Sequence, residues 1–251
     1  MEVTLYSVFS SHPAHAAHLM LAHKGIGHKV VNLVPGTHAA VLRALGFRRG
    51  TVPALTLDGR RLQGSREISR ALDELQPEPR LFPIDPQERI RVEEAERWGD
   101  DTLQPVPRRL FAWLTVHRRD ARILMAREAG LPAPSFLGSA NSLVAWYFAR
   151  KVQATDTEGV VAMVETLPVL LDHVDDLLNE CTIGGTERNA ADFQIATTVR
   201  LLMSFGDLVP VLENRKAASF AAEVLPEYPL SVPVGLVPPT WLERLRSSSA
   251  A

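Results

Sequence analysis

The fold is decided by residues 51–75, which read TVPALTLDGRRLQGSREISRALDEL. Two runs with strand character, TVPALTL and RRLQ, flank Asp58-Gly59, a dipeptide typical of tight β-turns. A helix is expected next, with Ser65 placed to cap it. Its apolar residues recur at helical spacing, at Ile68, Ala71, Leu72 and Leu75. This stretch therefore predicts a β-hairpin followed by an amphipathic helix.

The preceding residues predict a strand, a helix and a second strand. VTLYSVF (3–9) is rich in β-branched and aromatic residues, and the SSHP sequence after it suits the start of a helix. That helix is expected from Pro13 to Lys24, ending at Gly25, and KVVNL (29–33) is the next strand. Such an arrangement implies a parallel pair of strands joined by a right-handed crossover. With a looser helical segment near 38–45, the predicted order is β-α-β-α-β-β-α.

The sequence changes character after this unit. QPEPRLFPIDPQ (76–87) holds four prolines, which favours a linker over a helix or a central strand. The remaining apolar pattern is helical, and it predicts helices over 88–103, 108–125, 158–179, 190–205 and 241–246. We therefore expect an α/β domain over 1–76, a linker over 77–87 and an all-helical domain over 88–251.

Composition excludes several classes of protein. The chain has 251 residues, 46% of them hydrophobic, and a net charge of −2 without a run of like charges, so we expect neither a nucleic-acid partner nor an anionic membrane surface. The start, MEVTLYSVFS, lacks the pattern of a signal peptide and no apolar run is long enough to span a bilayer, which favours the cytoplasm. Cys181 is the only cysteine, which excludes an internal disulfide and a cysteine-rich metal cluster.

Val52-Pro53 lies just before a hairpin strand, the position at which thioredoxin-like folds hold a cis proline. A cis bond there would free the backbone N–H and C=O of Val52 to pair with a peptide-like ligand, much as an added strand does. The alternative is a trans proline at the first residue of a strand. Together with the order of elements, the pair predicts a thioredoxin-like domain with a cis bond.

Polar side chains are predicted at the starts of two helices. Ser65 lies where free N–H groups and the positive end of the helix dipole can receive a carboxylate. Ser10 and Ser11 lie where the same dipole would lower the pKa of a bound thiol and a hydroxyl could donate to its thiolate. Ordinary capping or solvation is the alternative for each serine. His12 could polarise the thiol or ligand.

Two histidines of the first helix could in principle reach one metal ion. His15 and His18 are three residues apart on the expected helix. No third ligand or carboxylate follows at a suitable spacing, so we predict no metal site.

LYSVFSSHPAHAAHLMLAHKGIGHKVVNL together with residues 51–75 resembles the front domain of cytosolic glutathione transferases of the serine or cysteine type, the zeta- and omega-like members. The resemblance places Ser11 at the catalytic position, Val52 against the backbone of glutathione and Ser65 at its γ-glutamyl carboxylate. We assign Ser10, His12, Thr51, Pro53 and Arg66 to the same cofactor site. GGTERNAADFQIATTVRLL (184–202) is similar to the late buried helix of that family, with Asn189 and Asp192 at the spacing of its capping motif.

The resemblance implies a transferase that adds glutathione, or another low-molecular-weight thiol, to an apolar electrophile. It also implies a detoxifying homodimer, and a substrate pocket between the domains to which we assign Trp98, Arg108 and Arg109. Gly64 stands where the family has Glu or Gln, and it favours a second hypothesis, a non-catalytic binding or interaction protein that has lost the cofactor site. A glutathione-dependent isomerase or dehalogenase would use the same site.

Overall fold

A computed structural model describes residues 1–131, 135 and 142–248 of the chain; the other residues lie within the rear part predicted over 88–251. The front part follows the predicted order, and its element bounds are β1 (Val3–Val8), α1 (His12–His23), β2 (Lys29–Leu33), α2 (His38–Ala44), β3 (Ala54–Leu57), β4 (Arg60–Gln63) and α3 (Ser65–Leu75). The strands form one sheet in the order β2-β1-β3-β4. β1 and β2 are parallel, as predicted, and β3 is antiparallel to both of its neighbours.

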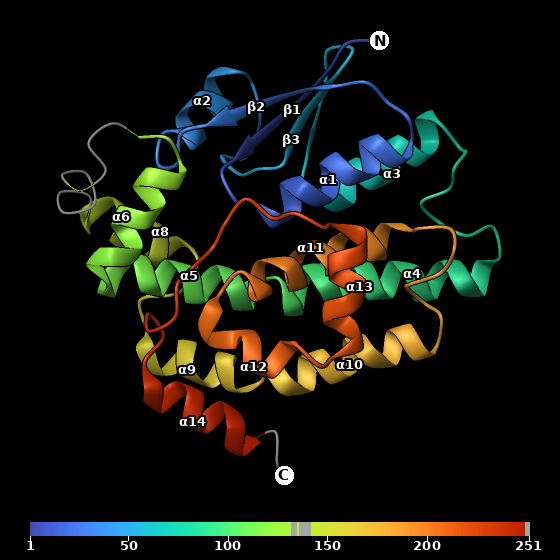
Figure 1. Ribbon diagram of the computed structural model, residues 1–251. Coiled ribbons are helices and arrows are strands. Elements are labelled where there is room, and N and C mark those ends of the chain that lie inside the picture. The colour runs from blue at the N-terminus through green and yellow to red at the C-terminus, as the bar shows by residue number, and fades with distance from the viewer. Residues whose placement is uncertain (132–134, 136–141, 249–251) are drawn as a thin grey trace.

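The two faces of the sheet carry different helices. Val3 and Leu5 of β1 point into the cluster that contains the buried residues of α1 and α3. Tyr6 points the other way, and its ring meets the ring of Phe47, next to Leu42 of α2, edge to face. The alternation along β1 therefore makes a sheet covered on both sides, with α1 and α3 lying between it and the rest of the molecule (Figure 1).

One prediction at the start of α3 is wrong. Ser65 is the first residue of the helix and not its cap, because Gly64 occupies the cap position with φ 98° and ψ 144°. The carbonyl of Gly64 accepts the first helical hydrogen bond, from the N–H of Ile68 at 3.1 Å. A backbone with that positive φ is open to glycine and strained for other residues, so the turn into α3 depends on Gly64.

The rear part is helical, as predicted. Its elements are α4 (Pro86–Trp98), the π-helix η1 (Gly99–Leu103), α5 (Pro105–His117), α6 (Arg119–Glu128), α8 (Ser142–Lys151), α9 (Thr157–Glu165), α10 (Leu167–Asn179), α11 (Ala190–Met203), the 3₁₀ turn η2 (Gly206–Leu208), α12 (Val209–Leu212), α13 (Lys216–Val224) and α14 (Pro239–Ser248). No helix among the described residues is long and apolar enough to cross a membrane.

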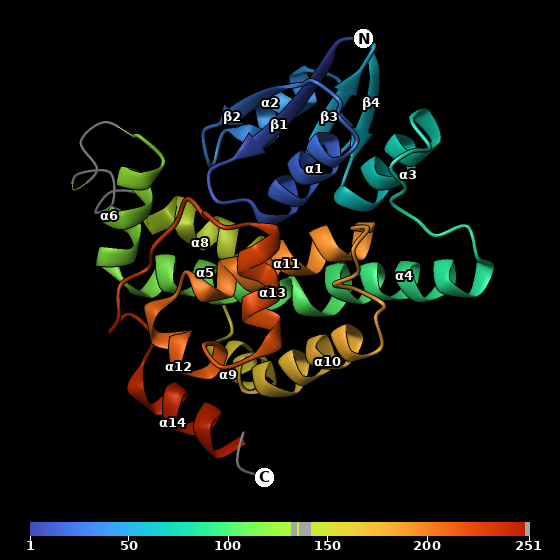
Figure 2. The same ribbon diagram turned by 45° about the vertical axis from the view of Figure 1, so that its right-hand side comes forward.

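Two predicted helix boundaries are wrong for a physical reason. α4, η1 and α5 follow one another along a single line (Figure 2), because Pro105 and Pro107 lie in the first turn of α5, where a missing N–H costs little. The break comes later, at the extended backbone of Arg118. The helix predicted over 158–179 is divided at Thr166, because Pro168 cannot donate the helical hydrogen bond to the preceding turn.

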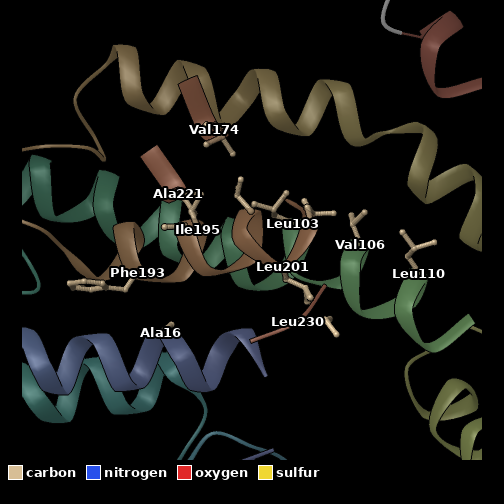
Figure 3. Packing of buried hydrophobic residues seen from close by; sticks show 14 of the residues in the cluster. Ala16, Leu103, Val106, Leu110, Val174, Phe193, Ile195, Leu201, Ala221 and Leu230 are labelled. Carbon is tan, nitrogen blue, oxygen red and sulfur yellow. The ribbon is translucent and has the colours of Figure 1, made fainter. Parts of the chain in front are cut away.

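Helix α11 is the centre of the molecule. All of its residues from Ala190 to Leu202 are buried except Arg200. It lies between α1 of the front part and α10 and α13 of the rear part, and Figure 3 shows its apolar side chains between Ala16 and Val174. The predicted capping motif is confirmed, since Asn189 accepts from the N–H of Asp192 at 3.1 Å and Asp192 accepts from the N–H of Asn189 at 2.7 Å. This helix therefore fixes the position of α1, which carries the candidate site.

Candidate functional site

Three loops meet at one edge of the sheet. Tyr6 of β1 pairs with Ala54 of β3, and Ala54 pairs with Gln63 of β4. The end of β1, the start of β3 and the end of β4 therefore lie side by side. The segments Ser10-Ser11, Val52-Pro53 and Gly64-Ser65 occupy these positions, and the N–H of Gly64 donates to the carbonyl of Pro53 at 2.9 Å. The structure thus brings together the three segments that the sequence singled out.

The Ser11 hydroxyl at the start of α1 makes no hydrogen bond within the part of the chain that the structure describes. Ser10 before it has φ 58°, a left-handed conformation that turns the chain from β1 into the helix. The N–H of Ser11 donates to the carbonyl of Val8 at 3.1 Å, and the residue is the N-cap of α1. Its side chain makes no capping hydrogen bond. The hydroxyl is therefore available to a ligand atom held at the positive end of the helix dipole.

His12 is buried and neutral. Only 4% of its surface is exposed, and its Nε2 atom is buried with no hydrogen-bond partner among the described residues. Burial, then the positive charge of Arg108 and then that of His15 hold its pKa well below 6.5. The ring is therefore uncharged at pH 7, and it can offer a hydrogen bond but not a positive charge.

The loop before β3 leaves Val52 outside the sheet ladder. Val52-Pro53 is cis, as predicted, and β3 begins only at Ala54. Gln63 holds this loop in place: its side-chain oxygen accepts from the N–H of Arg49 at 2.7 Å, and its Nε2 donates to the carbonyls of Arg49 at 2.6 Å and Thr51 at 3.2 Å. Gln63 is thus occupied by the loop and does not reach out to a ligand.

The start of α3 has the chemical features that favour an anion. The first N–H groups of a helix have no partner within it, and no side chain caps α3. Ser65, the first residue of the helix, is 3% exposed. Arg66 follows it, and the Nε atom of its guanidinium is buried with no partner among residues 1–131, 135 and 142–248. Free N–H groups, the helix dipole and a guanidinium all favour a carboxylate at this point.

Four polar residues recur at regular spacing along the long helix α4–η1–α5. They are Glu96, Asp100, Gln104 and Arg108, spaced four residues apart, and we call them the polar stripe. Glu96, which is fully buried, accepts from the hydroxyl of Ser69 at 2.8 Å and pairs with Arg70, both on α3. This contact joins the two parts of the molecule below the candidate site.

The other members of the polar stripe lie near the starts of α3 and α1. The pKa of Asp100 is raised, chiefly by burial and then by the neighbouring Asp101, although Arg66, Arg108 and Arg49 act in the opposite direction. Gln104 donates to the Asp100 carboxylate at 2.6 Å. Arg108 also acts on His12 at the start of α1, and Gln104 accepts from the side chain of Gln194 of α11 at 3.4 Å. Our sequence reasoning missed Glu96, Asp100 and Gln104, although their four-residue spacing across a helical segment was visible.

The structure separates the three predicted substrate-pocket residues. Trp98 packs edge to face on His173 of α10, with ring centroids 4.4 Å apart, on the side of α4 that faces away from α1. Arg109 donates to the carbonyl of Val152 at 3.1 Å and to the side-chain oxygen of Gln153 at 2.5 Å. Of the three, Arg108 is the residue that lies near the start of α1.

His18 of α1 forms a pair with His28 that the sequence did not predict. His18 Nδ1 lies 2.7 Å from Nε2 of His28, which follows the helix, and the contact is exposed. Among the described residues, no group of three or more His, Cys, Asp or Glu side chains is placed to hold a metal ion.

Comparison with known proteins gives these features a context. Residues 5–80 match the family model described as glutathione S-transferase, N-terminal domain. The chain has the glutathione S-transferase fold. A glutathione S-transferase from Rhodospirillum rubrum F11 is 19% identical over 97% of this chain and 99% of that one, with a TM-score of 0.63. The search of curated proteins found no match.

Other solved structures with this fold have different names. The beta-etherase LigF from Sphingobium sp. strain SYK-6 is 19% identical over 89% of this chain and 99% of that one, with a TM-score of 0.62. FzlA from C. crescentus is 21% identical over 98% of this chain and 99% of that one, with a TM-score of 0.59. At these identities the likeness establishes the fold, and the activity has to be argued from the site.

Proposed function

We propose that this protein is a serine-type, zeta- or omega-like glutathione transferase that binds glutathione at the edge of its sheet and activates the thiol at Ser11. The observation that carries the proposal is the uncommitted Ser11 hydroxyl at the start of α1, beside Val52 and Ser65, within residues that match the glutathione S-transferase N-terminal domain. A tripeptide thiol has one group for each of these three positions.

Each position suits a different part of the ligand. The α3 start, with Ser65 and Arg66, would receive the γ-glutamyl carboxylate. The backbone of Val52, which the ladder leaves unused, would pair with the cysteinyl residue, and Thr51 and Pro53 shape that loop. Ser10 and His12 flank the thiol. Another low-molecular-weight thiol with a carboxylate at the same distance from its sulfur would use the same three contacts.

The site would act by stabilising the thiolate and by proximity. The hydroxyl of Ser11 and the α1 dipole lower the pKa of the bound thiol, whose proton passes to solvent. The sulfur then attacks an electrophilic carbon held on the rear helices, so the carbon–sulfur bond forms and the leaving group departs with its electron pair. A dehalogenase or isomerase would share the first step and differ in the second substrate.

Gly64 favours a second candidate function, a binding or interaction protein without catalysis. Its φ of 98° excludes an unstrained Glu or Gln at this position, and the neighbouring Gln63 is fully occupied by Arg49 and Thr51. The γ-glutamyl amine would then lack the side chain that the resembling family supplies.

Isothermal calorimetry with glutathione separates the two candidates. We expect binding by the native protein, weakened about tenfold or more in Ser65→Ala, because a hydrogen bond to a charged group contributes about 1.5–3 kcal/mol. At a pH below the pKa of the bound thiol, Ser11→Ala should bind glutathione normally, and it should lose thiol transfer. A native protein that binds no glutathione would overturn the transferase proposal and favour the second candidate.

The same proposal extends to assembly and location. We propose a cytoplasmic homodimer, formed between the front part of one chain and the rear part of the other, as the resembling family suggests. Sedimentation equilibrium of the full chain tests it: a mass of two chains is expected, and a monomer at all concentrations would overturn it.

A further inference from the structure

We propose that the electrophile of this site carries a carboxylate, and that Arg108 binds it beside the thiol. The inference rests on the proposed thiol site for its chemistry, but the anion subsite itself is a property of Arg108 and its surroundings. It narrows the expected apolar electrophile to an apolar body with an acidic group.

Arg108 is half-buried, and its guanidinium makes no hydrogen bond or close ion pair among the described residues. It lies in the first turn of α5, and its Nε atom is buried and makes no hydrogen bond to any described residue. Its neighbour Arg109 differs, since two hydrogen bonds hold that side chain against residues 152–153. A buried guanidinium that lacks a partner is costly unless an anion or water completes its hydrogen bonds.

Asp100 does not complete the hydrogen bonds of Arg108. Arg66, Arg108 and Arg49 all act electrostatically on the Asp100 carboxylate of the polar stripe. That carboxylate accepts the side-chain amide of Gln104 at 2.6 Å, and among the described residues no hydrogen bond or close ion pair joins it to Arg108. The N–H groups of Arg108 therefore remain available to a ligand anion.

The position of Arg108 assigns it to the second substrate. Arg66 lies at the start of α3, where the γ-glutamyl carboxylate is proposed to bind, whereas Arg108 acts on His12, which directly follows Ser11. A guanidinium at the thiol end stabilises negative charge on the electrophile, both charge that develops during attack and charge already present as a carboxylate. It can bind a carboxylate through parallel N–H···O bonds and so set which carbon the sulfur meets.

Half-buried aromatic residues close in sequence to Arg108 and to Ser10 indicate the rest of the ligand. One turn along α5, Phe111 is half-buried and meets the ring of Phe205 edge to face, with centroids 6.3 Å apart. Phe9, next to Ser10, is also half-buried. An aryl or alkyl carboxylic acid with a leaving group fits this combination. In such a reaction the carbon–sulfur bond forms, the carbon–halogen bond breaks, the halide leaves with its electron pair and Arg108 stays protonated.

The first test measures binding of two unreactive probes. Calorimetry compares 3,5-dinitrobenzoate with 3,5-dinitrobenzamide, which has nearly the same shape and no charge. We expect the native protein to prefer the benzoate by about tenfold to a hundredfold, the range for a hydrogen bond to a charged group. Arg108→Met should abolish this preference, and Arg108→Lys should retain part of it because the charge remains.

A matched control removes the same charge elsewhere. Arg60 is exposed at the turn end of the β3–β4 hairpin, opposite the edge that carries Val52 and Ser65. Arg60→Met should therefore keep the full preference for the benzoate. Thermal unfolding of each variant confirms that it is folded before its binding is compared.

The second test uses turnover and separates the two proposals. With glutathione present, kcat/KM for 4-chloro-3,5-dinitrobenzoate should fall about tenfold or more in Arg108→Met, while kcat/KM for the matching benzamide changes less than about twofold.

The outcomes distinguish the two proposals. If the native protein does not bind glutathione but still prefers the benzoate, the proposed function alone is overturned. Equal native affinity for the two probes, or a preference that persists in folded Arg108→Met, overturns the carboxylate subsite. A loss of glutathione affinity in Arg108→Met without any probe preference would do the same, since Arg108 would then hold glutathione itself.

Discussion

The hydroxyl of Tyr228 donates a 2.7 Å hydrogen bond to the backbone carbonyl of Ser10, a residue 218 positions away in the sequence. Tyr228 lies in the segment between α13 and α14, which passes beside the start of α1 (Figure 1). Its ring also meets the ring of His15, with centroids 5.2 Å apart. Because Ser10 is the left-handed residue that turns the chain toward Ser11, the C-terminal segment fixes the backbone that presents the candidate catalytic hydroxyl.

Tyr228→Phe removes this hydrogen bond and keeps the ring. We expect the free energy of unfolding to fall by about 1–2 kcal/mol, because the Ser10 carbonyl is left without a donor. Thiol-transfer kcat should fall several-fold while glutathione affinity stays within about twofold, since Ser65 and Val52 are untouched. Tyr147→Phe, which removes an exposed hydroxyl on α8, is the control. A normal kcat in Tyr228→Phe would show that the segment stabilises the fold without positioning Ser11.

Ser11→Ala should raise the pKa of the glutathione thiol in the complex. A hydrogen bond to a charged group contributes about 1.5–3 kcal/mol, which corresponds to about 1–2 pKa units. The ultraviolet absorbance of the thiolate, followed against pH at saturating glutathione, measures this directly. Ser65→Ala at saturating glutathione should leave the thiol pKa unchanged. An unaltered thiol pKa in Ser11→Ala would remove Ser11 from the catalytic role.

The front part of the fold could be predicted because its signals are local. Asp58-Gly59 marks the hairpin turn, and Gly25, with φ 67°, ends α1 where the sequence indicates. The cap of α3 was predicted wrongly because the conformation of Gly64 depends on how β4 meets the helix, which no single residue type encodes. Serine before an amphipathic pattern is usually a cap, and here the preceding glycine takes that position.

The candidate site could be predicted only in part. Ser11, Val52 and Ser65 belong to short motifs, and strand pairing then brings them to one edge. Asp100 of the polar stripe lies in the π-helix η1, whose winding differs from the 3.6 residues per turn of a helical wheel, so its regular spacing did not by itself predict which residues it meets. Tyr228 joins the site through tertiary packing alone, so no local pattern could indicate it.

Gly64→Ala should destabilise the protein by about 1–3 kcal/mol, because φ 98° is strained for any residue with a Cβ atom. The space itself is adequate, since an added Cβ would lie 3.7 Å from the Arg49 side chain. Gly27→Ala is the matched control: nothing lies within 4 Å of its added Cβ and its φ is not positive, so stability should stay the same or rise slightly. Urea unfolding compares the two, and equal midpoints would contradict the strain.

Glu96 joins the polar stripe to α3, and its loss should be costly. Glu96→Ala leaves Arg70 and Ser69 without their buried acceptor, and breaking such a pair costs about 3–5 kcal/mol. Glu93→Ala, on the same helix, removes an exposed pair with Arg89 and should cost less than about 1 kcal/mol. Similar urea midpoints for the two variants would show that the Glu96 contact contributes little to the interface between the two parts.

His15 should make the protein less stable in weak acid. Burial, and next the charge of His18, lower its pKa to about 4, whereas in the unfolded chain it titrates near 6.5. The unfolded chain therefore binds the proton first, so stability present above pH 6.5 is lost as the pH falls toward 4, by about 3 kcal/mol in total. His12 and the ring of Tyr228 also face this side chain.

His15→Gln removes the titrating group. Between pH 7 and 4.5, the free energy of unfolding of the native protein should therefore fall relative to that of the variant. Carboxylates titrate in both proteins and cancel in the difference between their free energies of unfolding, so parallel curves over this range would mean that His15 is solvated in solution.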